Sequence, residues 1–388
     1  MYDFDKKINR KGTRSVKWDL TKELFGSEDV LPMWVADMDF PSPKEVQHAL
    51  VERINHGIFG YSFPSLETKQ IIKSWLQKRH GWDFSPSYIE FSSGVVKALS
   101  TAIRAFTKEG DHIVIQTPVY YPFFDMITLN DRVVIENKLV LKNGKYEIDF
   151  HNLEKKLAHE KVKMILLCNP HNPSGRVWTK KELTKIGQLA LKYNVMVVSD
   201  EIHSDLMLFD STHTPFASIH KQFAENSITC IAPSKTFNLA GLQASAVIIP
   251  NPKIRQTFKE CEKKQGTFTL NTLGITAMEA AYKHGEQWLN DLLEYLEENV
   301  RLVEKYISEE IPQLKIIRPQ STYLVWIDCR KLGKDEKELK SCLLKKGKLG
   351  LEMGSKYGKT GEGFVRMNIA CPKDVLMDGL MRLKKSFI

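Results

Sequence analysis

The amino-acid sequence predicts an α/β protein built on a mainly parallel, doubly wound sheet. Short apolar segments rich in β-branched residues occur at residues 112–116, 163–168, 195–198, 227–232 and 244–249. Segments with helical spacing of their apolar residues lie between several of these, at residues 97–107 and 180–193. Strands that alternate with helices in this way are typical of a parallel sheet with helices on both faces.

The length of the chain indicates more than one domain. The chain has 388 residues, and 42% of them are hydrophobic, which is ample for a packed core. We expect an extended N-terminal arm over residues 1–45, a large domain over 46–285 and a small α+β domain over 286–388. The arm contains several prolines, and we expect it to pack with the small domain and the active site.

Further helices and strands are predicted from the spacing of apolar residues. Residues 44–57 and 65–80 have the spacing of helices. Residues 289–307 carry apolar side chains at every third or fourth position, which predicts a long amphipathic helix. Residues 322–328 and 363–370 alternate between apolar and polar, as strands of a small sheet do.

Composition argues against several classes of protein. The first ten residues are charged, and about 18 consecutive apolar residues, enough for a membrane span, occur nowhere. We therefore expect a cytoplasmic protein without a membrane partner. The net charge of +9 comes from lysines dispersed among 47 acidic residues, so no nucleic-acid partner is expected. The six cysteines form no CxxC pair, which predicts free thiols and no metal site.

A lysine lies in the most informative segment of the chain. Lys235 stands between the predicted strands 227–232 and 244–249 and follows Pro233 and Ser234. Partial desolvation lowers the pKa of a lysine and leaves its amine free to form a Schiff base with a carbonyl group. The alternative is a lysine that extends from a turn into solvent.

Polar residues also follow two other predicted strands. Asn172 comes shortly after strand 163–168, and Asp200 follows strand 195–198. The spacings of 28 residues from Asn172 to Asp200 and 35 residues from Asp200 to Lys235 are close to one strand-helix-strand unit of ~30 residues. The carboxyl ends of such strands meet at one edge of the sheet, where open α/β sheets bind ligands. We therefore expect these three side chains to lie together.

The residues around these three positions resemble a known superfamily. The motifs are HNPSG at 171–175, SDEIH at 199–203 and SKTFNLAG at 234–241. In this order and spacing they resemble the fold-type I pyridoxal 5'-phosphate (PLP) enzymes, the aspartate aminotransferase superfamily, over nearly the whole chain. The resemblance implies the PLP-dependent transferase fold, with the cofactor carried by Lys235. Asp200 would keep the ring nitrogen protonated, and Asn172 would donate to the phenolate oxygen.

Three segments give a narrower match. LPMWVADMDF at 31–40, HGIFGY at 56–61 and APSKTFNLAG at 232–241 resemble the MalY/PatB-type branch, the carbon–sulfur lyases called cystathionine β-lyases. Trp34 and Ala36 would then pass the substrate pocket, and Tyr61 would reach the cofactor phosphate of the partner subunit in a homodimer. A core-packing strand is the alternative for Trp34, and an aromatic plug is the alternative for Tyr61.

The cofactor phosphate has an expected place at the start of a helix. The FSSG segment at 91–94 leads into the helix that follows, and free N–H groups at such a start form an anion site. The resemblance implies that the phosphate rests on the backbone of Val95, Val96 and Lys97, with help from Ser234.

Three positions depart from the superfamily pattern. Gln243 stands where many members have a phosphate-binding arginine, and Ala232 stands where they have a serine. His203 stands where many have a tyrosine, and it either tunes the phenolate end of the cofactor or is a hydrogen-bonded polar neighbour.

Three more residues are assigned by the resemblance. Tyr120 would stack on the pyridine ring, and Tyr121 would face the substrate. Arg366 would bind the substrate α-carboxylate, for which a bidentate guanidinium is suited. An arginine on an edge strand that faces water is the alternative for Arg366.

These features predict PLP-dependent β-elimination of cystathionine or other cysteine S-conjugates, which gives a thiol, pyruvate and ammonia. Lys235 and Tyr121 are the expected catalytic groups. A broad-specificity aminotransferase is the alternative enzyme, because Lys235, Asp200, Asn172 and Arg366 serve both reactions. A PLP-binding regulator with little turnover is the alternative outside enzymes, although such a protein usually needs a DNA-binding extension.

Overall fold

The computed structural model describes residues 2–267 and 269–387. Its α-helices are α1 (Val16–Asp19), α2 (Thr21–Phe25), α3 (Lys44–Asn55), α4 (Leu66–His80), α5 (Val95–Phe106), α6 (Pro122–Thr128), α7 (Phe150–Leu157), α8 (Lys180–Lys192), α9 (Lys221–Glu225), α10 (Pro233–Thr236), α11 (Pro252–Lys264), α12 (Thr272–His284), α13 (Glu286–Glu310), α14 (Glu336–Ser341) and α15 (Lys373–Phe387). Its strands are β1 (Leu31–Pro32), β2 (Ile89–Ser92), β3 (His112–Ile115), β4 (Val133–Glu136), β5 (Val140–Lys142), β6 (Lys145–Glu147), β7 (Val162–Cys168), β8 (Met196–Asp200), β9 (Ser227–Ile231), β10 (Ser245–Ile248), β11 (Lys315–Ile317), β12 (Leu324–Asp328), β13 (Leu349–Gly350), β14 (Glu352–Met353) and β15 (Phe364–Asn368).

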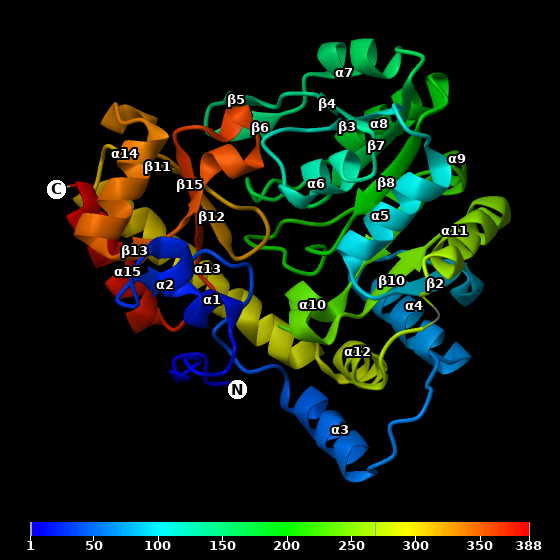
Figure 1. Cartoon of the computed structure of the whole chain (residues 1–388), viewed down its shortest axis with the longest axis horizontal. Coiled ribbons are helices and arrows are strands. Elements are labelled where there is room, and N and C mark those ends of the chain that lie inside the picture. Colours follow the sequence, from blue (N-terminus) through cyan, green and yellow to red (C-terminus); the bar gives the residue numbers. More distant parts are fainter. Residues whose placement is uncertain (1, 268, 388) are drawn as a thin grey trace.

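A seven-stranded sheet forms the larger part of the molecule (Figure 1). Its strand order is β2-β10-β9-β8-β7-β3-β4. Strand β10 runs antiparallel to its two neighbours, whereas the pairs β9–β8, β8–β7, β7–β3 and β3–β4 are parallel. The prediction of a mainly parallel α/β sheet is therefore confirmed.

Helices cover both faces of this sheet. Because alternate residues of a strand point to opposite faces, β7 contributes to two apolar clusters. Met164 and Leu166 pack with residues of α5, α6 and α11. Ile165 and Leu167 pack with residues of α7 and α8 on the other face. Burial on both faces explains why the sequence of β7 is a nearly continuous apolar segment.

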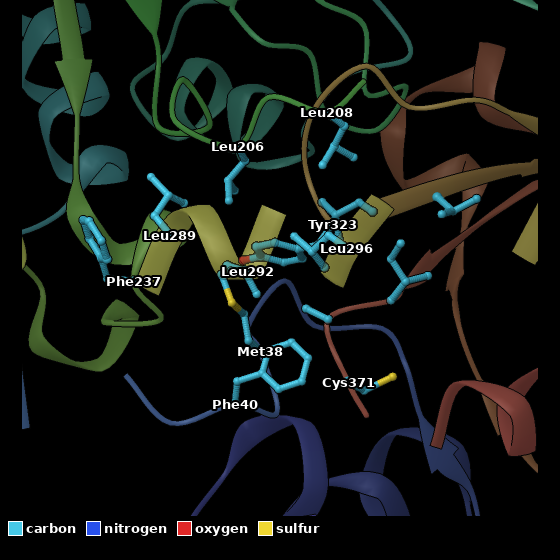
Figure 2. Packing of buried hydrophobic residues seen from close by; sticks show 14 of the residues in the cluster. Met38, Phe40, Leu206, Leu208, Phe237, Leu289, Leu292, Leu296, Tyr323 and Cys371 are labelled. Atoms are coloured by element: carbon cyan, nitrogen blue, oxygen red, sulfur yellow. The ribbon is translucent and has the colours of Figure 1, made fainter. Parts of the chain in front are cut away.

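A second sheet is antiparallel and has the order β11-β12-β15-β14. The 25-residue helix α13 leads into it, and Figure 1 shows this helix (yellow) extending from α12 toward the C-terminal part of the fold. Three leucines of α13, Leu289, Leu292 and Leu296, lie in one apolar cluster with Phe237 and Tyr323 (Figure 2). Residues of β10 and β12 belong to the same cluster, so the two sheets share a core. A small domain that starts at residue 286, the first residue of α13, stays a prediction.

The N-terminal arm differs from the extended segment that we expected. It contains the short helices α1 and α2, and β1 pairs in parallel with β13. Long-range contacts hold α1 in place: the Lys17 ammonium lies 2.6 Å from Asp39 Oδ2, and the Trp18 indole N–H donates to Asp39 Oδ1 over 2.9 Å. Such partners, about twenty residues away, leave no periodic signal in the sequence.

Among residues 2–267 and 269–387, no helix has the length and apolar character needed to cross a membrane. The six cysteines are free thiols. Within the same residues, no group of three or more histidine, cysteine or acidic side chains is arranged to hold a metal ion.

Candidate active site

The carboxyl ends of three neighbouring strands bring the predicted site residues together. In the sheet register, Cys168 of β7 pairs with Asp200 of β8, and Asp200 pairs with Cys230 of β9. Asn172 follows β7 by four residues, and Lys235 lies on the short helix α10 that follows β9. The three side chains that we expected at one edge of the sheet therefore do lie around one point.

A cavity of about 240 Å³ occupies this point. It is lined by Ala36, Ser93, Gly94, Val95, Val96, Lys97, Tyr120, Cys168, Asn172, Asp200, Ile202, His203, Ser234, Lys235, Ala240, Gln243 and Ala244. The lining combines the Lys235 amine, the Asp200 carboxylate and the start of α5.

The Lys235 amine is buried and held in a defined direction. Its Nζ donates to the carbonyl oxygen of Ala36 over 2.7 Å, and the Tyr323 hydroxyl donates to the same oxygen over 3.0 Å. Burial, together with the positive charge of Arg366, lowers the pKa of Lys235 to about 8. About a tenth of the amine is therefore uncharged and nucleophilic at pH 7, far more than for an ordinary lysine.

The Asp200 carboxylate is buried with little to stabilise its charge. Within the described residues, its hydrogen-bond donor is the backbone N–H of Ile202, over 3.2 Å. Burial raises the pKa of Asp200 to about 7, although the charge of Lys235 acts in the opposite direction. A cationic group placed in the cavity would supply the missing partner.

His203 is a neutral base at the same wall of the cavity. Burial, with the nearby charges of Lys235 and Arg366, lowers its pKa to about 3. In the part of the chain that the structure describes, its buried Nδ1 has no hydrogen-bond partner. The ring is therefore available to a polar ligand, which is consistent with a role at the cofactor.

Helix α5 points its first turn at the cavity. The N–H groups of Val95, Val96 and Lys97 belong to that turn, so the helix itself offers them no acceptor. Gly94 precedes them with φ of 107° and ψ of 153°, a conformation that residues with a Cβ rarely adopt. The Lys97 ammonium donates to Gln265 Oε1, so what this residue offers the cavity is its backbone and side-chain stem. This arrangement is suited to an anionic group such as a phosphate.

Arg366 is buried in β15 and links three parts of the site. Its two terminal nitrogens donate to Asn172 Oδ1 over 3.1 Å and to the carbonyl oxygen of Trp34 over 2.7 Å. The guanidinium also lies over the ring of Tyr357, 5.2 Å from its centre. Because Asn172 accepts through Oδ1, its amide nitrogen is the atom left to donate toward the cavity. The alternative of a water-facing arginine is therefore wrong, since Arg366 is 3% exposed.

Four predicted residues, Trp34, Tyr61, Tyr121 and Arg366, lie outside the cavity lining. The Trp34 ring packs edge-on against Phe25, and its Nε1 donates to the carbonyl oxygen of Lys17, so Trp34 reaches Arg366 through its backbone. The Tyr121 ring lies beside Tyr120 and is partly exposed, with its centre 5.6 Å from that of Tyr120. That Trp34 contributes to the substrate pocket stays a prediction.

Tyr61 projects from the loop between α3 and α4. Its side chain is fully exposed, and Ile58, Phe59 and Phe63 of the same loop are exposed as well. Figure 1 shows α3 and this loop at the bottom of the view. The alternative that Tyr61 is an aromatic plug within its own subunit is therefore wrong.

Comparison with known proteins places this site in a family. Residues 28–382 match the model of the family described as aminotransferase class I and II. The chain belongs to this family.

Full-length relatives and solved structures agree with that membership. Cystathionine beta-lyase PatB of Bacillus subtilis (strain 168) is 52% identical over 382 residues, which are 98% of this chain and 99% of the relative. Protein MalY of Escherichia coli (strain K12) is 34% identical over 99% of this chain and 98% of its own. The structure of cystalysin from Treponema denticola, which contains PLP, has a TM-score of 0.97 at 41% identity and covers 100% of this chain and 98% of its own. The PLP-bound C-S lyase from Staphylococcus hominis has a TM-score of 0.94 at 33% identity, with the same coverage.

These likenesses confirm the predicted superfamily, its MalY/PatB-type branch and the fold of the PLP-dependent aminotransferases.

Two asparagines that the sequence analysis did not single out also help to build the site. Asn238 donates to the carbonyl oxygens of Met38 and Phe40 and accepts from the Met38 N–H. Asn368 donates to the carbonyl oxygens of Val35 and Asp37. Both asparagines fix the arm segment that carries Ala36, and Asn368 could have been found because it shares a strand face with Arg366.

Proposed function

We propose that this protein is a PLP-dependent carbon–sulfur lyase that acts in the cytoplasm on cystathionine or related cysteine S-conjugates. The observation that carries the proposal is the set of groups in one cavity. The cavity holds the buried Lys235 amine, the buried Asp200 carboxylate, whose charge has little to stabilise it, and the start of helix α5. The 52% identity to cystathionine beta-lyase PatB supports the lyase rather than the aminotransferase reading.

The residues present fit the cofactor group by group. Asp200 would meet the ring nitrogen, and the cation there would relieve the burial of the carboxylate. The N–H groups of Val95, Val96 and Lys97 would hold the phosphate together with the Ser234 hydroxyl. With Gln243 and Ala232 in place of the expected arginine and serine, the phosphate depends on this helix start.

The planar ring has its own contacts. Tyr120 would cover one face of the ring. Asn172 would donate its amide N–H to the phenolate oxygen, since Arg366 fixes the orientation of that amide. His203 also lines the cavity and would contact the cofactor as well.

Lys235 would move protons once substrate is bound. PLP, when bound there, supplies an electron sink that stabilises negative charge at the substrate α-carbon. The Lys235 amine accepts the α-proton, because its lowered pKa makes the uncharged form accessible near neutral pH. The electron pair of the broken C–H bond then expels the β-substituent as a thiolate. The Lys235 ammonium or the Tyr121 hydroxyl returns a proton to this thiolate, and hydrolysis of the remainder gives pyruvate and ammonia.

Arg366 would orient the substrate for this proton transfer. A carboxylate on its guanidinium would replace the Trp34 carbonyl as a hydrogen-bond partner. The buried Nε of Arg366, which has no partner among the described residues, offers a further donor. Ala36 lies on the same arm segment and would contact the substrate through its backbone.

The working unit in this proposal is a homodimer with shared active sites. The apolar loop that carries Ile58, Phe59, Tyr61 and Phe63 is exposed in the single chain, and a second copy would cover it. Tyr61 would then add its hydroxyl to the phosphate site of the partner.

Product analysis tests the reaction. With cystathionine and no added keto acid, we expect sustained and equal formation of pyruvate, ammonia and homocysteine. A reaction that stops after one turnover and restarts only with a keto acid would make the protein an aminotransferase. Cofactor binding without turnover on any S-conjugate would favour a regulator.

A further inference from the structure

A second polar cluster lies behind the cavity, on the segment that follows β8. Along residues 200–205, Asp200 and His203 line the cavity, whereas Glu201 and Asp205 belong to other hydrogen-bonded groups. All four side chains are buried. The proposed reaction uses the first two and leaves Glu201 and Asp205 without a role.

Asp205 collects three donors from distant parts of the chain. Its Oδ1 accepts from the Trp75 indole N–H over 3.1 Å and from His80 Nε2 over 2.9 Å. Its Oδ2 accepts from the Thr236 hydroxyl over 2.9 Å. Both donors to Oδ1 come from α4, and Thr236 is the residue directly after Lys235. The carboxylate therefore ties the end of α4 to the turn that carries the lysine.

Glu201 holds the rest of the cluster through a similar set of hydrogen bonds. Glu201, the neighbour of Asp200, accepts from Ser199 Oγ over 2.8 Å and from the Phe216 N–H over 2.9 Å, and its Oε2 lies 2.9 Å from His213 Nε2. The rings of His213 and His80 meet edge-on, with 5.1 Å between their centres. One buried cluster thus joins the segment after β8 to α4, to the turn that carries Lys235 and to residues 213–216.

The Asp205 carboxylate is a firm anchor because its charge is stabilised. Burial alone would raise its pKa, but the hydrogen bond and charge of His80 and the Thr236 hydroxyl hold the net pKa below its ordinary value. A hydrogen bond to a charged acceptor is stronger than one between neutral groups and is directional. The Thr236 hydroxyl is therefore fixed relative to α4.

The turn that carries Lys235 needs such an anchor. Helix α10 has four residues, and its N-cap residue Ala232 has no side chain that could cap it. A single helical turn is not stable by itself, because nucleation costs more conformational entropy than its hydrogen bonds return. Phe237, which follows the turn, packs against the Trp75 ring with 5.6 Å between centres. The turn is thus held to α4 in two ways. Phe237 packs on Trp75, and the Thr236 hydroxyl donates to Asp205, which is itself hydrogen-bonded to α4.

We propose that Asp205, through the Thr236 hydroxyl, is the positioning residue that aims the Lys235 amine into the cavity. The proposal rests on the proposed function, because it takes Lys235 as the group that bonds the cofactor. The Thr236–Asp205 hydrogen bond limits rotation of α10, and the Ala36 carbonyl then fixes the amine at the other end of the lysine side chain. Misplacement of a reacting group by about 1 Å can slow a reaction by about 100-fold.

The test compares two threonine-to-valine changes of the same shape. Thr236→Val removes the donor to Asp205. Thr229→Val removes a buried hydroxyl on β9 that has no hydrogen-bond partner among the described residues. Thr236→Ser restores the donor. For each full-length protein, the cofactor is removed, and the rate of covalent bond formation with added PLP is followed by absorbance. Lyase kcat and KM are then measured on the reloaded enzymes.

We expect Thr236→Val to bond PLP at least about ten times more slowly and to lose kcat by a similar factor, with KM within about two-fold. Thr236→Ser should recover most of both rates, and Thr229→Val should match the wild type. If Thr236→Val does not fold, Thr236→Ala carries the same comparison. Thr236 variants that bond PLP as fast as Thr229→Val would overturn the positioning role. If the wild type and Lys235→Ala bond PLP equally well, the proposed function fails instead.

Discussion

At the scale of single residues, the site is governed by burial of charge. Lys235 and Asp200 both have pKa values displaced toward neutral pH, and burial is the first cause for each. For the lysine this makes the uncharged amine easier to form, and for the aspartate it leaves a carboxylate that gains from a cationic partner. Both pKa shifts reflect the unfavourable burial of a charge in the cofactor-free protein, and the bound cofactor would relieve it.

Asp200→Asn should therefore have opposite effects on stability and on activity. In the cofactor-free protein, Asp200 binds its proton more tightly when folded, with a pKa of about 7, than when unfolded, so its contribution makes stability fall as pH rises from about 4 to 7. Asparagine is neutral throughout this range. The variant should be more stable than the wild type at pH 8, by on the order of 2 kcal/mol, and about equally stable near pH 4.

Urea unfolding of both cofactor-free proteins at the two pH values measures this difference. The reloaded variant should bind PLP but lose kcat by about 100-fold or more, because no carboxylate keeps the ring nitrogen protonated. A stability gain that is the same at both pH values would contradict the burial argument. Near-normal turnover would remove the role of Asp200 in stabilising charge.

At the scale of elements, the strands and long helices could be predicted from sequence because their signals are local. The segments at 163–168, 195–198 and 227–232 became β7, β8 and β9, and this placed Asn172, Asp200 and Lys235 at one edge. The short helices α1 and α10 could not be predicted, because they depend on partners far along the chain such as Asp39 and Asp205.

Helix α5 allows a prediction about the phosphate site. A Cβ on Gly94 would meet nothing within 4 Å, so Gly94→Ala acts only through its backbone conformation. Strain at φ of 107° costs on the order of 1–3 kcal/mol, and the backbone that relieves it must turn the N–H groups of the first turn. We expect lower stability and an affinity for PLP that is at least about ten-fold weaker.

Gly333→Ala is the matched control, because Gly333 has φ of 63° with equally open space and lies away from the cavity. It should lower the stability of the protein without a change in PLP affinity. Fluorescence titration of cofactor-free protein with PLP measures the affinity, and thermal unfolding measures the stability. Equal loss of PLP affinity in both variants would show that general destabilisation, and not the helix start, is responsible.

At the scale of the whole molecule, the arm, the two sheets and α13 form one body around the cavity. The carbonyl oxygens of residues 34–37 accept from Arg366 and Asn368 of β15 and from Lys235 of α10, the helix that follows β9. The cluster in Figure 2 brings the same parts together through apolar side chains. The loop at Tyr61 is the exception, since it extends outward and is completed by a second subunit in our proposal.

Mixing inactive parents tests whether the sites are shared. Heterodimers of Lys235→Ala with Tyr61→Ala should regain part of the wild-type activity, because one of their two sites has an intact Lys235 and receives an intact Tyr61. Heterodimers of Lys235→Ala with Asp200→Asn should regain none, since both residues belong to the same subunit's site. The measurement is lyase activity after mixing, with heterodimers counted by mass. Equal activity in the two mixtures would contradict the role of Tyr61.

The central claim is that the Lys235 amine bonds the cofactor, and one measurement tests it most directly. The PLP-loaded protein is reduced with borohydride, digested, and its peptides are mapped by mass spectrometry. We predict that the reduced cofactor is found on the peptide that contains Lys235, and that Lys235→Ala carries none. A cofactor label on any other lysine of the wild-type protein would contradict the account.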